Sequence, residues 1–251
     1  MKQYKVAIIG NGMICNAAHI PAYKAMGDKV KIVAVADIRE EAAKETAERH
    51  GIPKYYVDPY KMLEEEKPDI ISVCTPNAYH KEYTLAGFRA GCHVVCEKPV
   101  AVTCADAEEM FNAAEKAGKH LFVIQSLRFT GNFKAAAGLA KSGCLGDIYY
   151  ADLNLVRRRG VPRWGMFHMA KENVGGAFCD LGVHMCDYLM SISGNPKMVS
   201  VSGSAVTRIV NKEKNIEFSN AESGAPTGLF TPRKFDMKEF DVEEFANGYI
   251  R

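Results

Sequence analysis

The chain has 251 residues, of which 47% are apolar, and its 32 basic side chains nearly balance 30 acidic ones. This length allows one large domain or two smaller ones with a sizeable core. The balanced charge argues against a nucleic-acid-binding protein that relies on bulk charge, and the sequence has no apolar run long enough to span a membrane.

The first half of the chain alternates apolar, β-rich runs with helical patterns. The expected strands cover residues 4–10, 31–37, 69–76, 93–99 and 120–125. Helices are expected between them, because Gly51 and Gly91 stand where helices end and Thr103 stands where one begins. Strands that are apolar throughout and separated by helices indicate a parallel sheet buried on both faces.

A glycine-rich stretch, GNGMIC, follows the first expected strand and opens a helix within a β-α-β unit. A lone GxGxxG pattern is weak evidence, but this is the context that a dinucleotide-binding loop requires. Gly10 permits the tight turn, and Gly12 lets the backbone approach a pyrophosphate. Met13 and Ile14 stand at the helix start, where that group would bind. Cys15 replaces the third glycine, which predicts slightly looser packing of helix on strand.

Asp37 ends the second expected strand, about 20 residues beyond the glycine-rich loop. A carboxylate at this place accepts hydrogen bonds from an adenosine ribose and repels a 2′-phosphate, which favours NAD over NADP. Arg39 partly offsets that repulsion, so NADP stays an alternative. Asp37 also fits an N-cap for the helix that starts near Arg39, and the two roles are compatible.

Two later strand ends carry polar residues where a parallel sheet binds its ligands. Thr75, Asn77 and His80 follow one strand, and Glu97 and Lys98 end the next. We expect all five at the cofactor site, although His80 also fits an ordinary helix surface and Lys98 an exposed loop. The proline after Lys98 restricts this lysine to an extended backbone, which would hold its ammonium group at the strand end.

The segment GAFCDLGVHMCDY has the spacing of a helix with one apolar face. Asp180, His184 and Asp187 are spaced i, i+4 and i+7, so they share another face. Two carboxylates and an imidazole on one face fit a proton-handling site. Within it, we expect Asp187 to have a structural role. Taken alone, an ordinary surface pair explains Asp180 and His184 better.

The second half also contains alternating patterns. Residues 147–160 and 197–210 alternate like half-buried strands, and residues 147–251 should supply three or four strands in all. The segment RRRGVPRWG lies between the first of these strands and the helix that carries His184, where it could form a substrate loop.

Three residues of the second half are candidates for substrate binding. Arg158 belongs to a run of three arginines, which either bind a ligand anion or form a solvated strand edge. Trp164 either covers a nicotinamide or simply packs. Arg128 leaves the last strand of the first half and could face the cleft.

The eight cysteines are scattered through apolar runs, without a CxxC pair or any Cys/His group of zinc spacing. Free thiols in a reducing compartment are the better interpretation, so we expect no metal site and a cytoplasmic protein. The first residues run directly into an expected strand, so we expect no signal peptide.

Together these patterns resemble, in order and spacing, the Gfo/Idh/MocA oxidoreductases, named for glucose–fructose oxidoreductase and inositol dehydrogenase. The resemblance covers essentially the whole chain. It rests on the GxGxxx loop, Asp37, CTPN with His80, EKP at 97–99 and DxGxH at 180–184. It implies an α/β protein with a Rossmann dinucleotide-binding domain over residues 1–125. A shortened α+β domain with an open, mainly antiparallel sheet would follow over residues 126–251.

The resemblance also implies an NAD-dependent dehydrogenase that moves hydride between nicotinamide and a secondary hydroxyl of a sugar, a polyol or a derivative. Lys98, Asp180 and His184 would flank the nicotinamide. His184 would be the general acid and base, Asp180 would bind a substrate hydroxyl, and Lys98 would stabilise negative charge on the reacting oxygen. The alternatives are a non-catalytic nucleotide-binding regulatory protein, a truncated inactive homologue, or a redox-assisted glycosidase.

Members of this family commonly continue beyond the point at which this chain stops, with strands that complete the second sheet. We therefore expect a second domain that is looser than the first, and either a longer parent protein or a partner that covers the sheet. In the full-length form we expect a homo-oligomer built through this sheet. Neither nucleic acid nor a membrane is expected as a partner.

Overall fold

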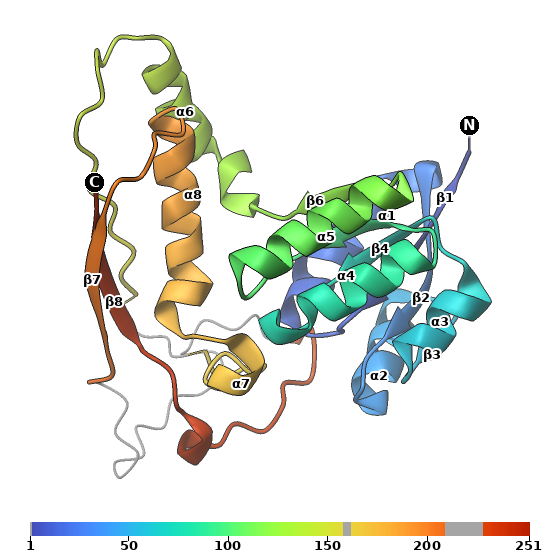
Figure 1. Cartoon of the computed structure of the whole chain (residues 1–251). Coiled ribbons are helices and arrows are strands. Elements are labelled where there is room, and N and C mark those ends of the chain that lie inside the picture. Colours follow the sequence, from blue (N-terminus) through green and yellow to red (C-terminus); the bar gives the residue numbers. More distant parts are fainter. Residues whose placement is uncertain (1, 158–161, 209–227) are drawn as a thin grey trace.

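The computed structural model describes residues 2–157, 162–208 and 228–251. Its larger part is a sheet of six parallel strands in the order β3-β2-β1-β4-β5-β6 (Figure 1). The strands are β1 (Tyr4–Ile9), β2 (Val30–Ala36), β3 (Tyr55–Tyr56), β4 (Ile70–Val73), β5 (His93–Cys96) and β6 (Leu121–Val123). The predicted parallel sheet is confirmed, and the two-residue β3 adds an edge strand that the sequence pattern did not indicate.

Helices connect the strands, as the sequence predicts. They are η1 (Cys15–His19), α1 (Ile20–Ala25), η2 (Gly27–Lys29), α2 (Glu40–His50), α3 (Pro59–Glu66), η3 (Asn77–Tyr79), α4 (His80–Arg89) and α5 (Cys104–Ala117). Gly51 ends α2 with a left-handed φ of 64°, a conformation that glycine adopts without strain. Thr103 begins α5, because its hydroxyl accepts a hydrogen bond from the Asp106 backbone N–H.

Successive side chains of β1 alternate between two cores, one on each face of the sheet. Val6 and Ile8 pack with residues of α1 and α2, whereas Ala7 and Ile9 pack with residues of α3, α4 and α5. All four are at most 1% exposed. A strand that is covered by helices on both faces must be apolar throughout, which is why the continuous apolar runs predicted the layers correctly.

The strand order reverses beside β1, because the chain passes to β2 on one side and returns to β4 on the other. In a parallel sheet of this kind, ligands bind outside the carboxyl ends of the strands at the point of reversal. The glycine-rich loop follows β1, and Asp37, Thr75 and Glu97 follow β2, β4 and β5. The topology therefore gathers the expected cofactor residues along one edge of the sheet.

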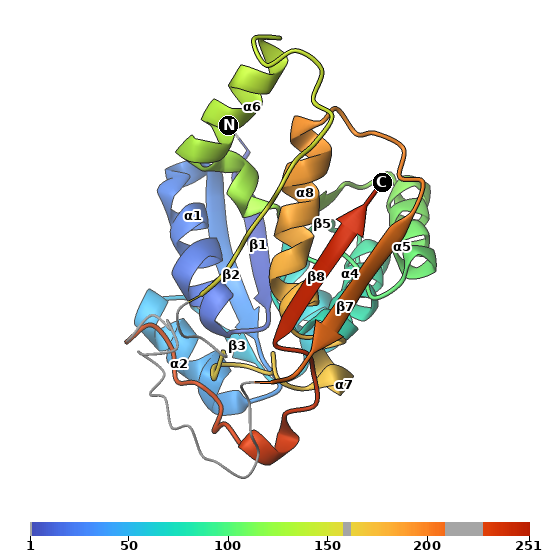
Figure 2. The ribbon, with the colours of Figure 1, turned by 90° about the vertical axis from the view of Figure 1, so that its left-hand side faces the viewer.

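The second half begins with η4 (Ser126–Phe129) and α6 (Gly131–Lys141). It continues through α7 (Ala170–Asn173), η5 (Phe178–Gly182), α8 (Val183–Ile192), β7 (Val201–Val206), η6 (Met237–Glu239) and β8 (Phe245–Ile250). β7 and β8 pair antiparallel, with Val206 opposite Phe245. Figures 1 and 2 show α8 lying against one side of this pair, on the flank of the molecule away from β3.

One predicted strand is wrong. Residues 147–157, the described part of the expected strand over 147–160, contain no strand, and the described residues of the second half hold two strands rather than three or four. Tyr149 is 97% exposed and Val156 is 82% exposed, so the alternating apolar residues meet no neighbouring edge. An alternating pattern becomes a strand only when another strand pairs with it.

Candidate active site

The glycine-rich loop leaves β1 through a backbone that only glycine can adopt. Gly10 has a φ of 92°, and a Cβ atom there would lie 2.6 Å from the carbonyl oxygen of Cys74. A Cβ on Gly12 would meet nothing within 4 Å, so the loop backbone faces open space at this position. Met13 and Ile14 follow it and are half-buried. The loop thus combines a tight turn with an exposed backbone, as a pyrophosphate site requires.

Asn16 holds the glycine-rich loop from behind, and the sequence analysis did not identify it. Its side-chain N–H donates to the carbonyl oxygens of Asn11 and Gly12, both at 3.0 Å, and its Oδ1 lies 3.0 Å from His50 Nε2. Cys15, in the place of a third glycine, is fully buried in the core. Burial raises the pKa of its thiol to about 12, so it packs as a neutral side chain.

Asp37 closes the loop on its other side. Its Oδ2 accepts a hydrogen bond from Asn11 N at 2.8 Å, and its Oδ1 accepts one from Arg39 N at 2.9 Å. Helix α2 has Arg39 at its N-cap position, so the Asp37 side chain precedes the helix rather than capping it. A carboxylate has about four lone-pair sites, which leaves acceptor capacity for a ligand.

The residues that follow β4 join the two halves of the chain. Asn77 donates through Nδ2 to the carbonyl oxygen of Asn173, in α7, at 2.8 Å. His80 is fully buried, and its ring nitrogens face the carbonyl oxygens of Pro99 at 2.7 Å and Thr75 at 3.0 Å. The structure therefore places His80 beneath the site, where it fixes two loops, rather than on the surface that a cofactor would touch.

A chain of buried polar groups supports the end of β5. Glu97, 6% exposed, contacts His19 Nε2 through Oε1 at 2.9 Å, and His19 Nδ1 lies 3.2 Å from Ser72 Oγ. Tyr23 continues the chain with a 2.7 Å hydrogen bond to the same hydroxyl. Glu97 Oε2 also accepts a hydrogen bond from the Lys98 backbone N–H at 3.2 Å. These contacts fix the backbone from which the Lys98 side chain leaves the sheet.

Lys98 reaches from the end of β5 to the second half of the chain. Its Nζ donates to Asp180 Oδ1 at 2.7 Å and to the Asp180 carbonyl oxygen at 2.9 Å. Both side chains are 16% exposed. An ammonium and a carboxylate that are mostly withdrawn from water, yet still reachable, form a site that can bind a polar ligand.

His184 lies one turn beyond Asp180, at the start of α8. Burial, followed by the positive charge of Lys98, lowers its pKa from the ordinary value of 6.5, against the opposing pull of Asp180 and Glu97. Its Nδ1 is buried and has no hydrogen-bond partner within the described part of the chain. The ring is therefore neutral near pH 7 and can accept a proton.

Glu243 anchors the start of the helical segment that carries these groups. Its carboxylate accepts hydrogen bonds from the backbone N–H groups of Gly176 and Phe178, both at 2.9 Å, and its carbonyl oxygen accepts one from Ala177 at 3.0 Å. A Cβ on Gly176 would lie 1.8 Å from that carbonyl oxygen, so glycine is required there. The sequence analysis missed Glu243, because it is far along the chain and carries no motif.

The three residues expected to bind substrate have different surroundings. Arg128 forms two hydrogen bonds of 2.6 Å with the carboxylate of Asp187, so its guanidinium is already engaged. Trp164 is 6% exposed and packs edge-on against Phe167, while its indole N–H is buried without a partner among the described residues. Arg158 lies outside the described residues. The structure thus brings Lys98, Asp180 and His184 together but does not add Arg128 to them.

All eight cysteines lie in the described residues, and each is a free thiol. Within the same ranges, no group of three or more His, Cys, Asp or Glu side chains is arranged to hold a metal ion. Among the described helices, none combines the length and the apolar character needed to cross a membrane.

Two family models match the chain. Residues 4–125 match the GFO_IDH_MocA model, described as an oxidoreductase family with an NAD-binding Rossmann fold. Residues 133–245 match the GFO/IDH/MocA C-terminal domain.

Curated relatives are named as dehydrogenases. D-glucoside 3-dehydrogenase of Escherichia coli K12 is 36% identical over 248 residues, which is 98% of this chain and 68% of the relative. Myo-inositol 2-dehydrogenase of Thermotoga maritima is 30% identical over 190 residues, or 76% of this chain and 55% of the relative. The chain thus spans about half to two thirds of the length of these relatives.

Among solved structures, the WlbA dehydrogenase from Chromobactrium violaceum, in complex with NADH and UDP-GlcNAcA, has a TM-score of 0.80. It is 25% identical, and the match covers 100% of this chain and 64% of that one. GenD2 from gentamicin A biosynthesis, in complex with NAD, has a TM-score of 0.76 at 20% identity, which shows a shared fold.

Proposed function

The chain belongs to the GFO/IDH/MocA oxidoreductase family, and we propose that its site oxidises a secondary hydroxyl of a sugar, a polyol or a derivative with NAD. The reaction breaks the C–H and O–H bonds of the alcohol and forms a ketone. NAD, when bound, supplies the acceptor for the hydride that leaves the carbon. The proton that leaves the oxygen needs a base in the protein.

The observation that carries this proposal is the contact between Lys98 and Asp180. Lys98 belongs to the Rossmann sheet and Asp180 to the segment that precedes α8, so their 2.7 Å ion pair joins the cofactor edge to the helix that carries His184. An ordinary surface pair between Asp180 and His184 does not account for this arrangement, because the carboxylate is directed at the lysine instead.

The protein groups divide the proton chemistry among them. His184, with its lowered pKa, takes the hydroxyl proton in oxidation and returns it in reduction. The Lys98 ammonium donates a hydrogen bond to the reacting oxygen, where negative charge develops as the proton leaves. Asp180 holds the lysine and accepts a hydrogen bond from a substrate hydroxyl.

The residues present also fit the dinucleotide. Gly12 has open space beside its backbone for the pyrophosphate, at the beginning of a helical segment. Asp37 would accept the ribose hydroxyls with its remaining lone pairs and would repel a 2′-phosphate, which favours NAD. We place the nicotinamide at the other end of the crevice, between Asn77 and Lys98.

The name of the E. coli relative makes glucosides the first substrates to test, and the T. maritima relative adds inositols. The decisive experiment is to follow NADH absorbance with the purified chain, NAD and a panel of glucosides, free sugars and polyols. NADH formation with at least one secondary alcohol, slowed strongly in Lys98→Met, is the expected result. NAD binding without turnover of any panel member would instead favour the regulatory alternative.

We also propose that the protein associates with itself through the β7–β8 pair. Phe245 and Tyr249 lie on the same face of β8 and are 50% and 64% exposed, which is unusual for two large apolar side chains on one sheet face of a monomer. Light scattering should give a mass above that of one chain. Tyr249→Glu should lower that mass.

A further inference from the structure

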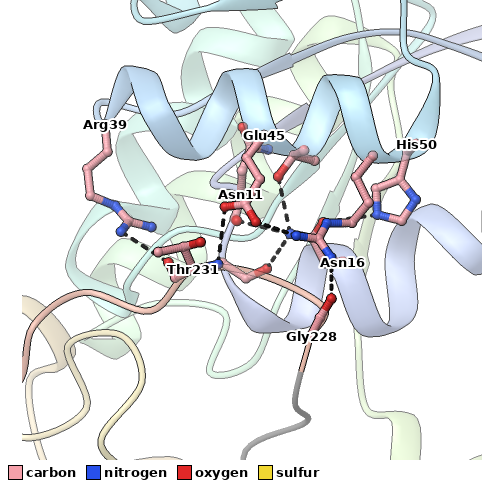
Figure 3. A network of polar contacts seen from close by, with 10 residues as sticks. Asn11, Asn16, Arg39, Glu45, His50, Gly228 and Thr231 are labelled. Atoms are coloured by element: carbon pink, nitrogen blue, oxygen red, sulfur yellow. Dashed lines mark hydrogen bonds and ion pairs between the residues drawn. The ribbon is translucent and has the colours of Figure 1, made fainter.

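One segment of the second half lies against the Rossmann half, beside the cofactor edge. Residues 228–231, called here the 228–231 segment, run along α2 (Figure 3). Thr231 N donates to Glu45 Oε2 at 3.2 Å, and Arg49 donates to the carbonyl oxygen of Gly228. Arg49 and Glu45 also pair with each other, one turn apart on α2. Two charged side chains of one helix therefore fix both ends of the 228–231 segment.

The same segment reaches the group that would select the cofactor. Arg39 donates through Nη1 to the carbonyl oxygen of Thr231 at 3.5 Å, while its backbone N–H donates to Asp37 at 2.9 Å. Its guanidinium Nε lies 3.7 Å from the same carboxylate. The arginine that could otherwise pair with a 2′-phosphate is thus engaged by Thr231 on one side and by Asp37 on the other.

The segment is linked to the glycine-rich loop through Arg39 and Asp37, because the Asp37 carboxylate accepts hydrogen bonds from the backbone N–H groups of both Arg39 and Asn11. His50, next to Arg49 on α2, contacts Asn16, and Asn16 holds the carbonyl oxygens of Asn11 and Gly12. Figure 3 shows Asn11, Asn16 and His50 in one network with Gly228 and Thr231 beside α2. A displacement of the segment would therefore act near both the ribose end and the pyrophosphate end of the loop.

The 228–231 segment flanks the site and does not fill it. Gly12 keeps open space beside its backbone, and the Asp37 side chain is still 11% exposed. A segment that occupied the adenosine position would bury this carboxylate. The segment therefore lies on the α2 side of Asp37 and leaves this carboxylate and the Gly12 backbone accessible.

We propose that the 228–231 segment is the outer wall of the adenosine end of the site, and that its docking on Glu45 and Arg49 raises the affinity for NAD relative to NADP. This inference rests on the proposed NAD binding. The wall adds contact area beside the adenosine and keeps Arg39 away from a 2′-phosphate. The carbonyl oxygen of Thr231 accepts a hydrogen bond from Arg39 and so offsets part of the positive potential that would attract a 2′-phosphate. Glu45 and Arg49 act as positioning residues, since they touch the segment and not the proposed ligand.

Calorimetry with NAD, NADP and ADP-ribose on the 251-residue chain tests whether the 228–231 segment contributes to binding at the adenosine end. Glu45→Ala and Arg49→Met should each weaken NAD and ADP-ribose binding about 3- to 10-fold, the range expected for losing one ordinary hydrogen bond. NADP affinity should fall less or rise, so that the NAD preference shrinks. Glu48→Gln is the matched control, because Glu48 lies on the same helix with its side chain 69% exposed and should leave all three affinities unchanged.

Hydrogen exchange on the unmutated chain gives a second measurement that does not depend on a variant that folds. NAD and ADP-ribose should slow exchange in the peptide that contains residues 228–235, and nicotinamide mononucleotide should not. Two results would contradict the proposed wall. One is unchanged or tighter NAD binding in Glu45→Ala, and the other is an exchange rate at residues 228–235 that ADP-ribose does not change. If the unmutated chain bound no dinucleotide at all, the proposed function would fail together with it.

Discussion

The Nζ of Lys98 lies 2.7 Å from Oδ1 of Asp180, although 82 residues separate the two in the sequence. Because β5 ends at Cys96 and α8 begins at Val183, this ion pair ties the Rossmann sheet to the helix that carries His184. The ammonium of Lys98 thereby lies near enough to His184 for its positive charge to lower the pKa of the imidazole. This arrangement leads to the following predictions.

His184→Ala should lower turnover by about 10² to 10⁴-fold, the usual contribution of a positioned general base. NAD affinity should change little, since the role we propose for His184 is toward the substrate hydroxyl and not toward NAD. Steady-state kinetics and calorimetry on the same preparation separate the two effects. An equal loss of NAD binding and turnover would make His184 a structural residue.

Lys98→Met should lower turnover by about 10² to 10³-fold, because it removes the ammonium that we propose as the donor to the developing oxyanion. Asp180→Asn should lower it less and should raise KM, as it keeps a hydrogen-bond acceptor. A double-mutant cycle should show strong coupling between the two positions. Additive effects would contradict a shared role.

kcat/KM should fall as the pH is lowered, with an inflection below pH 6.5. Burial and Lys98 lower the pKa of His184 below this ordinary value. Protonated His184 cannot take the hydroxyl proton. A lowered folded-state pKa also means that stability is fully present above pH 6.5 and is lost as the pH falls through the folded pKa. Urea unfolding should be measured for the unmutated chain and for His184→Ala between about pH 7.5 and about pH 5, which spans the titration range of histidine. The free energy of unfolding should fall less over this range in the variant.

Asp37→Ser should shift the preference toward NADP. The substitution removes the charge that repels a 2′-phosphate and leaves a neutral hydroxyl that can still accept a hydrogen bond from Asn11 or Arg39. Calorimetry with both cofactors measures the change. NADP binding at least as tight as NAD binding in the unmutated chain would contradict the assignment of Asp37.

Glu243→Ala should destabilise the second half by about 1 to 3 kcal/mol, because two backbone N–H groups at the start of the helical segment lose their acceptor. The neighbouring Glu244 accepts a hydrogen bond from the Arg208 backbone N–H, so the comparison is Glu41→Ala instead, which changes an exposed glutamate on α2. Hydrogen exchange should accelerate over residues 176–192 in Glu243→Ala and stay slow in the β1–β4 strands. Uniform acceleration over the whole chain would contradict a local anchoring role.

The Rossmann half was largely predictable, because its strands are buried on both faces and appear as continuous apolar runs, as in Val6–Ile9. The second half was less so. Residues 147–157 alternate correctly but pair with no strand, and nothing local distinguishes this segment from β7.

The candidate site was likewise predictable from the sequence only in part. The sequence predicts Asp37 and Lys98 because each ends a strand. It does not predict that Glu243 accepts hydrogen bonds from Gly176 and Phe178, or that His19 contacts Glu97. Those contacts join residues that are distant in the chain, and no spacing rule connects them.

The most direct test of the central claim is the deuterium isotope effect on NADH formation, with a substrate from the panel labelled at the carbon that bears the reacting hydroxyl. The account predicts NAD-dependent NADH formation that deuterium slows in the unmutated chain. Both His184→Ala and Lys98→Met should abolish most of this rate while NAD stays bound. NADH formation at an undiminished rate in both variants would contradict the assignment of Lys98, Asp180 and His184 as the catalytic group.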